Sequence, residues 1–224
     1  LVVLIVLATL SLVLPNFTIS GQGQAYDARQ LAFVSIVTLV LYGVFLYIQT
    51  TLHRDYFVSL GDEEETGQTH VPSNRIVGFS VVLLLFALLA VVLLAKKFAA
   101  VVEVGRTALE LPVAVTGVVV AFLILLPEGV AAVHAAKRDD LQKALNLAMG
   151  SSLATIGLTI PAVACVTIVL GKSLTLGLGS VDTILLVLVL LTSTLTFGQG
   201  RTNVLYGFVH LVIFATFLFL TAFP

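Results

Sequence analysis

The stretch LLPEGVAAVHAAKRDD, residues Leu125 to Asp140, decides how this chain is interpreted. It places a carboxylate, Glu128, directly after one of the most apolar runs of the chain, because residues 111–127 contain no charged group. An ionised side chain at membrane depth costs roughly 3 kcal/mol on insertion scales, and such residues usually mark ion paths or proton relays. Glu128 is therefore the first candidate for a functional residue.

The composition indicates an all-α integral membrane protein. Hydrophobic residues make up 59% of the 224 residues and charged residues 10%, whereas a soluble domain carries about 25% charged residues. Long apolar runs predict spanning helices, because backbone groups in lipid must be paired within the segment. The net charge of -1 is spread without a basic patch, so we expect no nucleic-acid partner. The single cysteine, Cys165, excludes a disulfide framework and a cysteine-based metal site.

About seven transmembrane helices are predicted. The apolar segments cover residues 1–14, 29–53, 75–95, 112–136, 141–170, 181–197 and 204–223. The first of them lacks the basic start of a signal peptide, so we interpret it as the tail of a spanning helix. Charged residues between positions 96 and 110 indicate an interfacial stretch in which the third helix continues.

The turn KRDDLQK, residues 137–143, predicts an antiparallel hairpin between the fourth and fifth helices. Its three basic residues favour the cytoplasmic side. Glu128 precedes the middle of the turn by 11 to 12 residues, and Ser151 follows it by the same number. At about 1.5 Å per residue, both lie some 17 Å from the turn. We therefore expect Pro127–Gly129 to face Gly150–Ser152 across the hairpin.

The residue types at this depth suit an ion site. The carboxylate of Glu128 can hold a proton or a metal ion, and the hydroxyls of Ser151 and Ser152 add hard oxygen ligands. Pro127 frees a backbone carbonyl, while Gly129 adds flexibility, so we expect unusual backbone here. Gly150 permits close helix approach.

Several alternatives stay open at this point. Asn146 contacts either the ion pathway or a neighbouring helix, and His134 is expected near the interface. For His210 in the last helix, we expect a helix–helix hydrogen bond; the alternative is a role in a proton relay. The alternative function is an intramembrane serine hydrolase that pairs Ser151 with His210, because acyl chemistry needs a serine–histidine hydrogen bond. A purely structural bundle would leave Glu128 without a reason.

The stretch PEGVAAVHAAKRDDLQKALNLAMGSSLATIGLTIPA resembles the second α-repeat of the cation/Ca²⁺ exchanger superfamily. It is most similar to the bacterial calcium/proton (sodium, potassium/proton) antiporters, and the resemblance is strongest over residues 111–165. It implies that Glu128 binds cation or proton and that Ser151 and Ser152 belong to the facing helix. Two departures leave room for Na⁺ or K⁺ beside Ca²⁺: Leu125 replaces a common asparagine, and Ala154 replaces a common glutamine.

The resemblance also implies an organisation and an activity. Residues 1–57 would be the last two helices of a first half, the first of them truncated. Residues 58–75 would be an acidic cytoplasmic loop, and residues 76–224 a second half of five helices. The expected activity is exchange of a cation for protons in a bacterial inner membrane, which is transport rather than enzymatic catalysis. The expected partners are inorganic cations, protons, the lipid bilayer and an N-terminal half of the same protein, with no cofactor besides the transported ions. With no first α-repeat in these 224 residues, we expect half an ion site and no transport by the chain alone.

Overall fold

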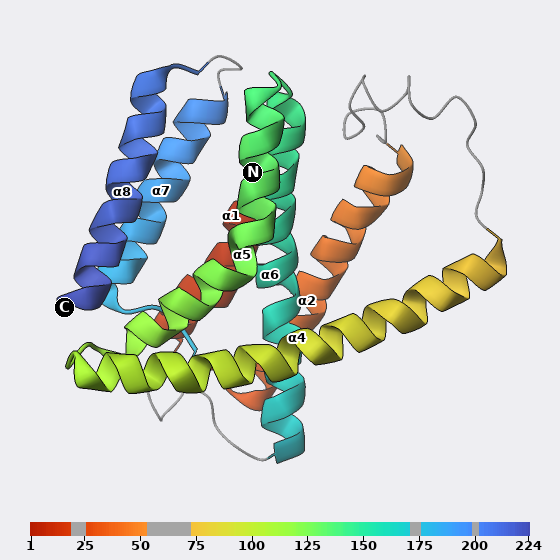
Figure 1. The fold of residues 1–224 in the computed structure, drawn as a ribbon, viewed down its shortest axis with the longest axis horizontal. Helices are drawn as coiled ribbons and strands as arrows, with labels where there is room; N and C mark the ends of the chain where they lie inside the picture. The colour runs from red at the N-terminus through yellow and green to blue at the C-terminus, as the bar shows by residue number, and fades with distance from the viewer. Residues whose placement is uncertain (19–25, 53–72, 171–175, 199–201) are drawn as a thin grey trace. The chain divides into compact units, whose positions relative to one another are not determined.

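A computed structural model describes residues 1–18, 26–52, 73–170, 176–198 and 202–224, and every regular element in these ranges is helical. Figure 1 shows the elements along the chain. They are α1 (Val2–Ala8), the π-helical η1 (Thr9–Val13), the 3-10 helix η2 (Leu14–Phe17), α2 (Ala28–Tyr47), the π-helical η3 (Ile48–Leu52), α4 (Asn74–Ala108), α5 (Val113–Lys137), α6 (Leu141–Leu170), α7 (Ser180–Gly198) and α8 (Val204–Ala222).

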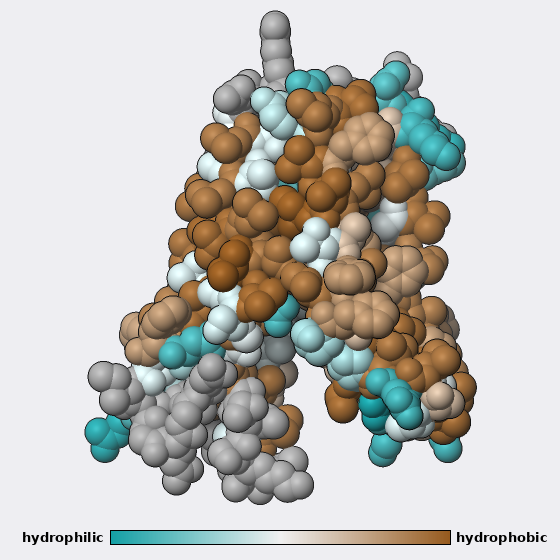
Figure 2. Space-filling model, turned by 90° about the vertical axis from the view of Figure 1, so that its left-hand side faces the viewer, coloured by the Kyte–Doolittle hydropathy of each residue, from teal (hydrophilic) through white to brown (hydrophobic). Residues whose placement is uncertain are grey.

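Six of the described segments are long and apolar enough to cross a membrane. They are Ala28–Leu52, Asn74–Ala108, Val113–Lys137, Leu141–Thr167, Ser180–Gly198 and Val204–Ala222. The first predicted segment is a shorter apolar helix, Val2–Phe17. Brown apolar side chains cover most of the coloured surface in Figure 2, as a protein surrounded by lipid requires. The predicted all-α integral membrane protein is confirmed, as is the continuation of the third helix beyond position 95.

The chain divides into two compact units. One comprises residues 1–59 and 131–217, and the other residues 60–130 and 218–224. The boundary falls within α5, between Val130 and Ala131. The predicted acidic loop over residues 58–75 lies almost entirely outside the described residues.

In the first unit, α2 packs on α6. A buried cluster holds the pair together and contains Tyr26, Leu31, Val34, Ile160 and Ala164. The Tyr26 hydroxyl donates to the Leu10 carbonyl at 2.5 Å, which ties the start of α2 to the π-helical turn of η1. Burial raises the pKa of Tyr26 to about 12.

A short turn joins the end of α5 at Lys137 to the start of α6 at Leu141. Asp139 adopts a left-handed conformation with φ 60°, which aspartate tolerates better than most residues. The Asp140 N–H bonds the Ala135 carbonyl at 3.0 Å, and its carboxylate accepts from the Lys143 N–H at 3.0 Å. One residue thus closes α5 and caps the first turn of α6.

Candidate functional site

Glu128 lies on α5, nine residues before the helix ends at Lys137. Its side chain is half-buried, and its Oε2 is enclosed without a hydrogen-bond donor among the described residues. An enclosed carboxylate oxygen normally has a partner, since burying a polar group without one is costly. A proton, a cation, a water or a donor outside the described residues can satisfy such an atom.

The backbone around Glu128 is helical throughout, because α5 runs without a break through Pro127 and Gly129. The unusual backbone expected around Glu128 is therefore limited to one missing helical hydrogen bond. Pro127 has no N–H, so the carbonyl of Leu123, four residues earlier, lacks its usual helical donor. A Cβ added at Gly129 would meet no described atom within 4 Å.

The serine pair lies on α6, with Ser151 ten residues after the start of the helix at Leu141. Both serines are half-buried, and the Ser152 hydroxyl donates to the Ala148 carbonyl at 2.9 Å. A Cβ at Gly150 would likewise meet nothing among the described atoms within 4 Å. The serines belong to the first unit and Glu128 to the second, so their pairing stays a prediction. Glu128 lies nine residues before the end of α5, and Ser151 lies ten residues after the start of α6.

Asn146 is the second group of the predicted site with an unsatisfied atom. Its Nδ2 is enclosed and has no acceptor in the described part of the chain. Its amide nitrogen therefore forms no hydrogen bond to a neighbouring helix there, and whether Asn146 contacts the ion pathway stays a prediction. This amide N–H can therefore donate to a carbonyl or carboxylate that lies outside the described residues.

Among the described residues, no hydrogen bond joins His134 or His210 to Ser151 or Ser152. His210 Nε2 lies 3.2 Å from the Thr196 hydroxyl of α7, and its ring stacks on Phe197. This is the predicted helix–helix hydrogen bond, between α7 and α8. His134 is exposed near the end of α5. The hydrolase alternative finds no support, because His210 is paired with Thr196 instead of Ser151.

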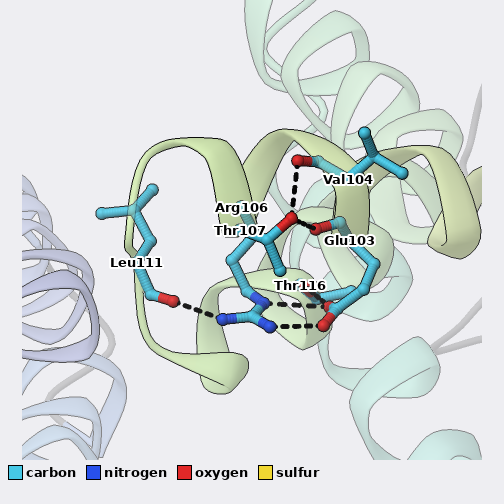
Figure 3. A network of polar contacts seen from close by, with 6 residues as sticks. All are labelled: Glu103, Val104, Arg106, Thr107, Leu111 and Thr116. Atoms are coloured by element: carbon cyan, nitrogen blue, oxygen red, sulfur yellow. Dashed lines mark hydrogen bonds and ion pairs between the residues drawn. The ribbon is translucent and has the colours of Figure 1, made fainter.

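A second acid within a spanning helix, Glu103, is fully engaged (Figure 3). Its carboxylate accepts from Arg106 Nε at 3.0 Å and from the second terminal nitrogen of the same guanidinium. The Thr116 hydroxyl of α5 donates to it at 2.9 Å, and Arg106 also donates to the Leu111 carbonyl at 2.6 Å. These bonds join the end of α4 to the first turns of α5. The sequence predicted an interfacial stretch that includes Glu103 but not the partners of this acid, although the i,i+3 spacing to Arg106 is a recognisable signal for an ion pair.

The two acids differ in whether the described residues satisfy them. Glu103 has an arginine and a hydroxyl as partners, so its charge is satisfied within the protein. Glu128 has an enclosed oxygen without a partner in the described residues. A buried polar atom usually has a partner, so the partner of Glu128 Oε2 is to be sought beyond the described residues.

Replacement of Glu103 by Gln is expected to lower the apparent melting temperature by roughly 2–4 °C. The amide keeps the shape of the side chain but removes the ion pair with Arg106 at the corner between α4 and α5. Thermal unfolding of the purified chain in detergent measures the change. Glu110→Gln, at an exposed position in the same corner, is the matched control. An equal loss in both variants would show that the network of Glu103 has no special role.

Comparison with known proteins adds the family context. The family described as sodium/calcium exchanger protein matches residues 79–223. The protein y4hA of Sinorhizobium fredii (strain NBRC 101917 / NGR234), described as an ionic transporter, is 48% identical over 225 residues, which are 100% of this chain and 61% of that protein. The sodium-potassium/proton antiporter ChaA of Escherichia coli (strain K12) is 35% identical over 218 residues, 96% of this chain and 60% of that protein. The chain thus spans about three fifths of the length of each relative. No solved structure matches it.

Proposed function

This chain belongs to the sodium/calcium exchanger protein family, and on that premise we propose that it forms part of a cation/proton antiporter of the bacterial inner membrane. Glu128 is the residue for which the cation and the proton compete. The observation that carries the proposal is the enclosed Oε2 of Glu128, which lies in a spanning helix without a donor among the described residues.

Competition follows from the chemistry of one carboxylate in an apolar helix. A proton neutralises it and lets it remain in surroundings of low dielectric constant. A metal ion neutralises it as well, but it needs the ionised form of the same oxygens. The two ligands therefore exclude each other, and alternate exposure of the site to the two sides of the membrane converts this exclusion into exchange.

The cation must draw further ligands from outside the carboxylate. Ca²⁺ takes six to eight oxygen ligands, and no group of three or more His, Cys, Asp or Glu side chains is assembled in the described ranges. Ser151, Ser152 and the Leu123 carbonyl are the oxygens that α5 and α6 can add. An inverted first half of the whole protein would supply the rest, because transporters of this architecture bind ions at the repeat interface. Na⁺ and K⁺ are proposed beside Ca²⁺, because the relative ChaA is described as a sodium-potassium/proton antiporter.

The test is ion flux in reconstituted vesicles. Vesicles that contain the full-length protein are expected to move protons when an outward gradient of Na⁺, K⁺ or Ca²⁺ is applied, as reported by a pH-sensitive dye. Vesicles with the 224-residue chain alone are expected to show none. If the full-length protein moves protons without a cation gradient, the antiporter assignment is overturned. Robust exchange by the 224-residue chain alone would show that this half of the site suffices.

Removal of both hydroxyls in Ser151→Ala/Ser152→Ala is expected to raise the half-saturating cation concentration about 10-fold, because neutral oxygen ligands are lost while the charge of Glu128 stays. The concentration dependence of flux measures this effect. Thr159→Val is the matched control on the same helix, since the Thr159 hydroxyl bonds its own helix through the Thr155 carbonyl at 2.5 Å. An unchanged half-saturation in the serine variant would place both hydroxyls outside the pathway.

A further inference from the structure

Helices α7 and α8 lie side by side (Figure 1) and leave a cavity of about 310 Å³ between them, here called the α7–α8 slot. Its lining begins at Asp182 and ends at Val189 on α7, and begins at His210 and ends at Phe217 on α8, all within the first unit. Along each of these stretches the lining residues are three or four positions apart, so one face of each helix borders the slot. Both stretches cover seven residues, which corresponds to a length of about 10 Å.

Hydrogen bonds restrain the slot at both ends. At the inner end, His210 Nε2 lies 3.2 Å from the Thr196 hydroxyl of α7. At the outer end the lining includes Leu178, whose N–H donates to the Leu12 carbonyl at 3.0 Å and whose carbonyl accepts from Asn16 Nδ2 at 2.5 Å. The slot is therefore a built feature of the hairpin, and its volume reaches the roughly 300 Å³ at which ligand pockets begin.

The polar groups of the slot are placed unevenly along it. Apart from Asp182 and His210, every described residue that lines it is apolar. Asp182 is the third residue of the span that starts at Ser180, so it lies where a spanning helix meets the lipid headgroups. His210 lies about 10 Å deeper, at the level of the hydrocarbon chains.

The carboxylate of Asp182 forms no ion pair among the described residues. An acid in the first turn of a helix is favoured by the helix dipole, but this effect does not require an apolar cavity beside it. A negative charge at headgroup level above a hydrocarbon-lined slot is complementary to one kind of molecule, an ammonium group that carries an apolar chain.

We propose that the α7–α8 slot binds one acyl chain of phosphatidylethanolamine, with the primary ammonium of the headgroup donating to Asp182. A primary ammonium has three donors for a carboxylate that accepts, and bonds between charged groups are the stronger ones. Phosphatidylglycerol has the same chains and phosphate but no cation, so its headgroup offers nothing to neutralise the acid. The chain and the headgroup keep the depths that they have in a bilayer. This site is separate from Glu128 and does not depend on transport.

The experiment measures lipid binding to the purified 224-residue chain in detergent, by native mass spectrometry with phosphatidylethanolamine or phosphatidylglycerol of identical acyl chains. The unaltered chain is expected to bind phosphatidylethanolamine about fivefold more tightly, as one partly exposed ion pair contributes. Asp182→Asn is expected to abolish this preference and Asp182→Glu to keep it. The control Asp139→Asn, at an exposed position of the turn after α5, is expected to keep it as well. Equal binding of both lipids by the unaltered chain, or a preference retained by Asp182→Asn, would overturn the proposal.

A fluorescence measurement decides the matter if Asp182→Asn does not fold. The chain contains no tryptophan, so a single introduced one reports on its surroundings. Phe214→Trp places it in the lining of the slot, and Phe208→Trp places it at a position of the same helix that is 60% exposed and outside the lining. In vesicles of both lipids, brominated acyl chains on phosphatidylethanolamine are expected to quench the tryptophan at 214 more than the same chains on phosphatidylglycerol. The tryptophan at 208 is expected to be quenched equally by both. Equal quenching at 214 would show that the slot does not select this lipid, and the proposal would fail.

Discussion

Glu128→Gln is expected to abolish cation-driven proton movement while leaving the amount and the melting temperature of the protein nearly unchanged. Glutamine keeps the size of the side chain but can neither release a proton nor carry the negative charge that a cation requires. Loss of a second-shell group costs a metal site 10- to 100-fold in affinity, so loss of the charged ligand itself is expected to cost at least about 100-fold. Flux in vesicles that contain the full-length protein measures the effect.

The control for this variant is Glu110→Gln, an acid-to-amide change at an exposed position after α4. It is expected to keep full flux, which separates loss of the site from a general loss of negative charge. Glu128→Asp provides a graded test, since it retains the carboxylate but withdraws it by one methylene; partial flux is expected. Normal exchange by Glu128→Gln would show that the proton and the cation do not compete for this residue.

Gly157→Leu is expected to lower the apparent melting temperature by roughly 6–12 °C, if overpacking costs up to about 3 kcal/mol. Gly157 is buried where α6 meets α2, and a Cβ there would lie 3.1 Å from Tyr42 Cβ and 3.3 Å from Tyr42 Cγ. These atoms are next to the backbone, so rotation of the side chain relieves little of the clash. Thermal unfolding in detergent measures the loss.

Two further variants make the Gly157 result specific. Gly43→Leu, on the exposed side of α2 where an added Cβ meets nothing within 4 Å among the described atoms, is expected to change the melting temperature little. Tyr42→Ala in the Gly157→Leu background is expected to restore part of the loss, because the leucine then occupies the vacated space. Similar melting temperatures for the leucine variants at 43 and 157 would contradict the close approach of α2 and α6.

Several features were predictable because they depend on local chemistry. Apolar runs bounded by charges predicted the spanning segments, and the KRDDLQK turn predicted where α5 ends and α6 begins. The resemblance around Glu128 predicted the family to which residues 79–223 belong. The ion pair of Glu103 with Arg106 could be predicted from the i,i+3 spacing, but the bond from Thr116 could not, because Thr116 lies 13 residues away on another helix.

The sequence by itself determined that this is an all-α membrane protein with one acid placed deep in an apolar helix, since hydropathy, charge spacing and helix-breaking residues act within a few turns of the chain. Only the tertiary structure decided which polar groups find partners. Glu103 is satisfied by a neighbouring helix, whereas Glu128 Oε2 and Asn146 Nδ2 have no partner in the described part of the chain. Likewise, Gly157 and not Gly150 is the glycine of α6 that a neighbouring side chain, Tyr42, approaches closely. The physical reason is that hydrogen bonds and close contacts between helices depend on their mutual rotation, which periodicity along one helix does not encode.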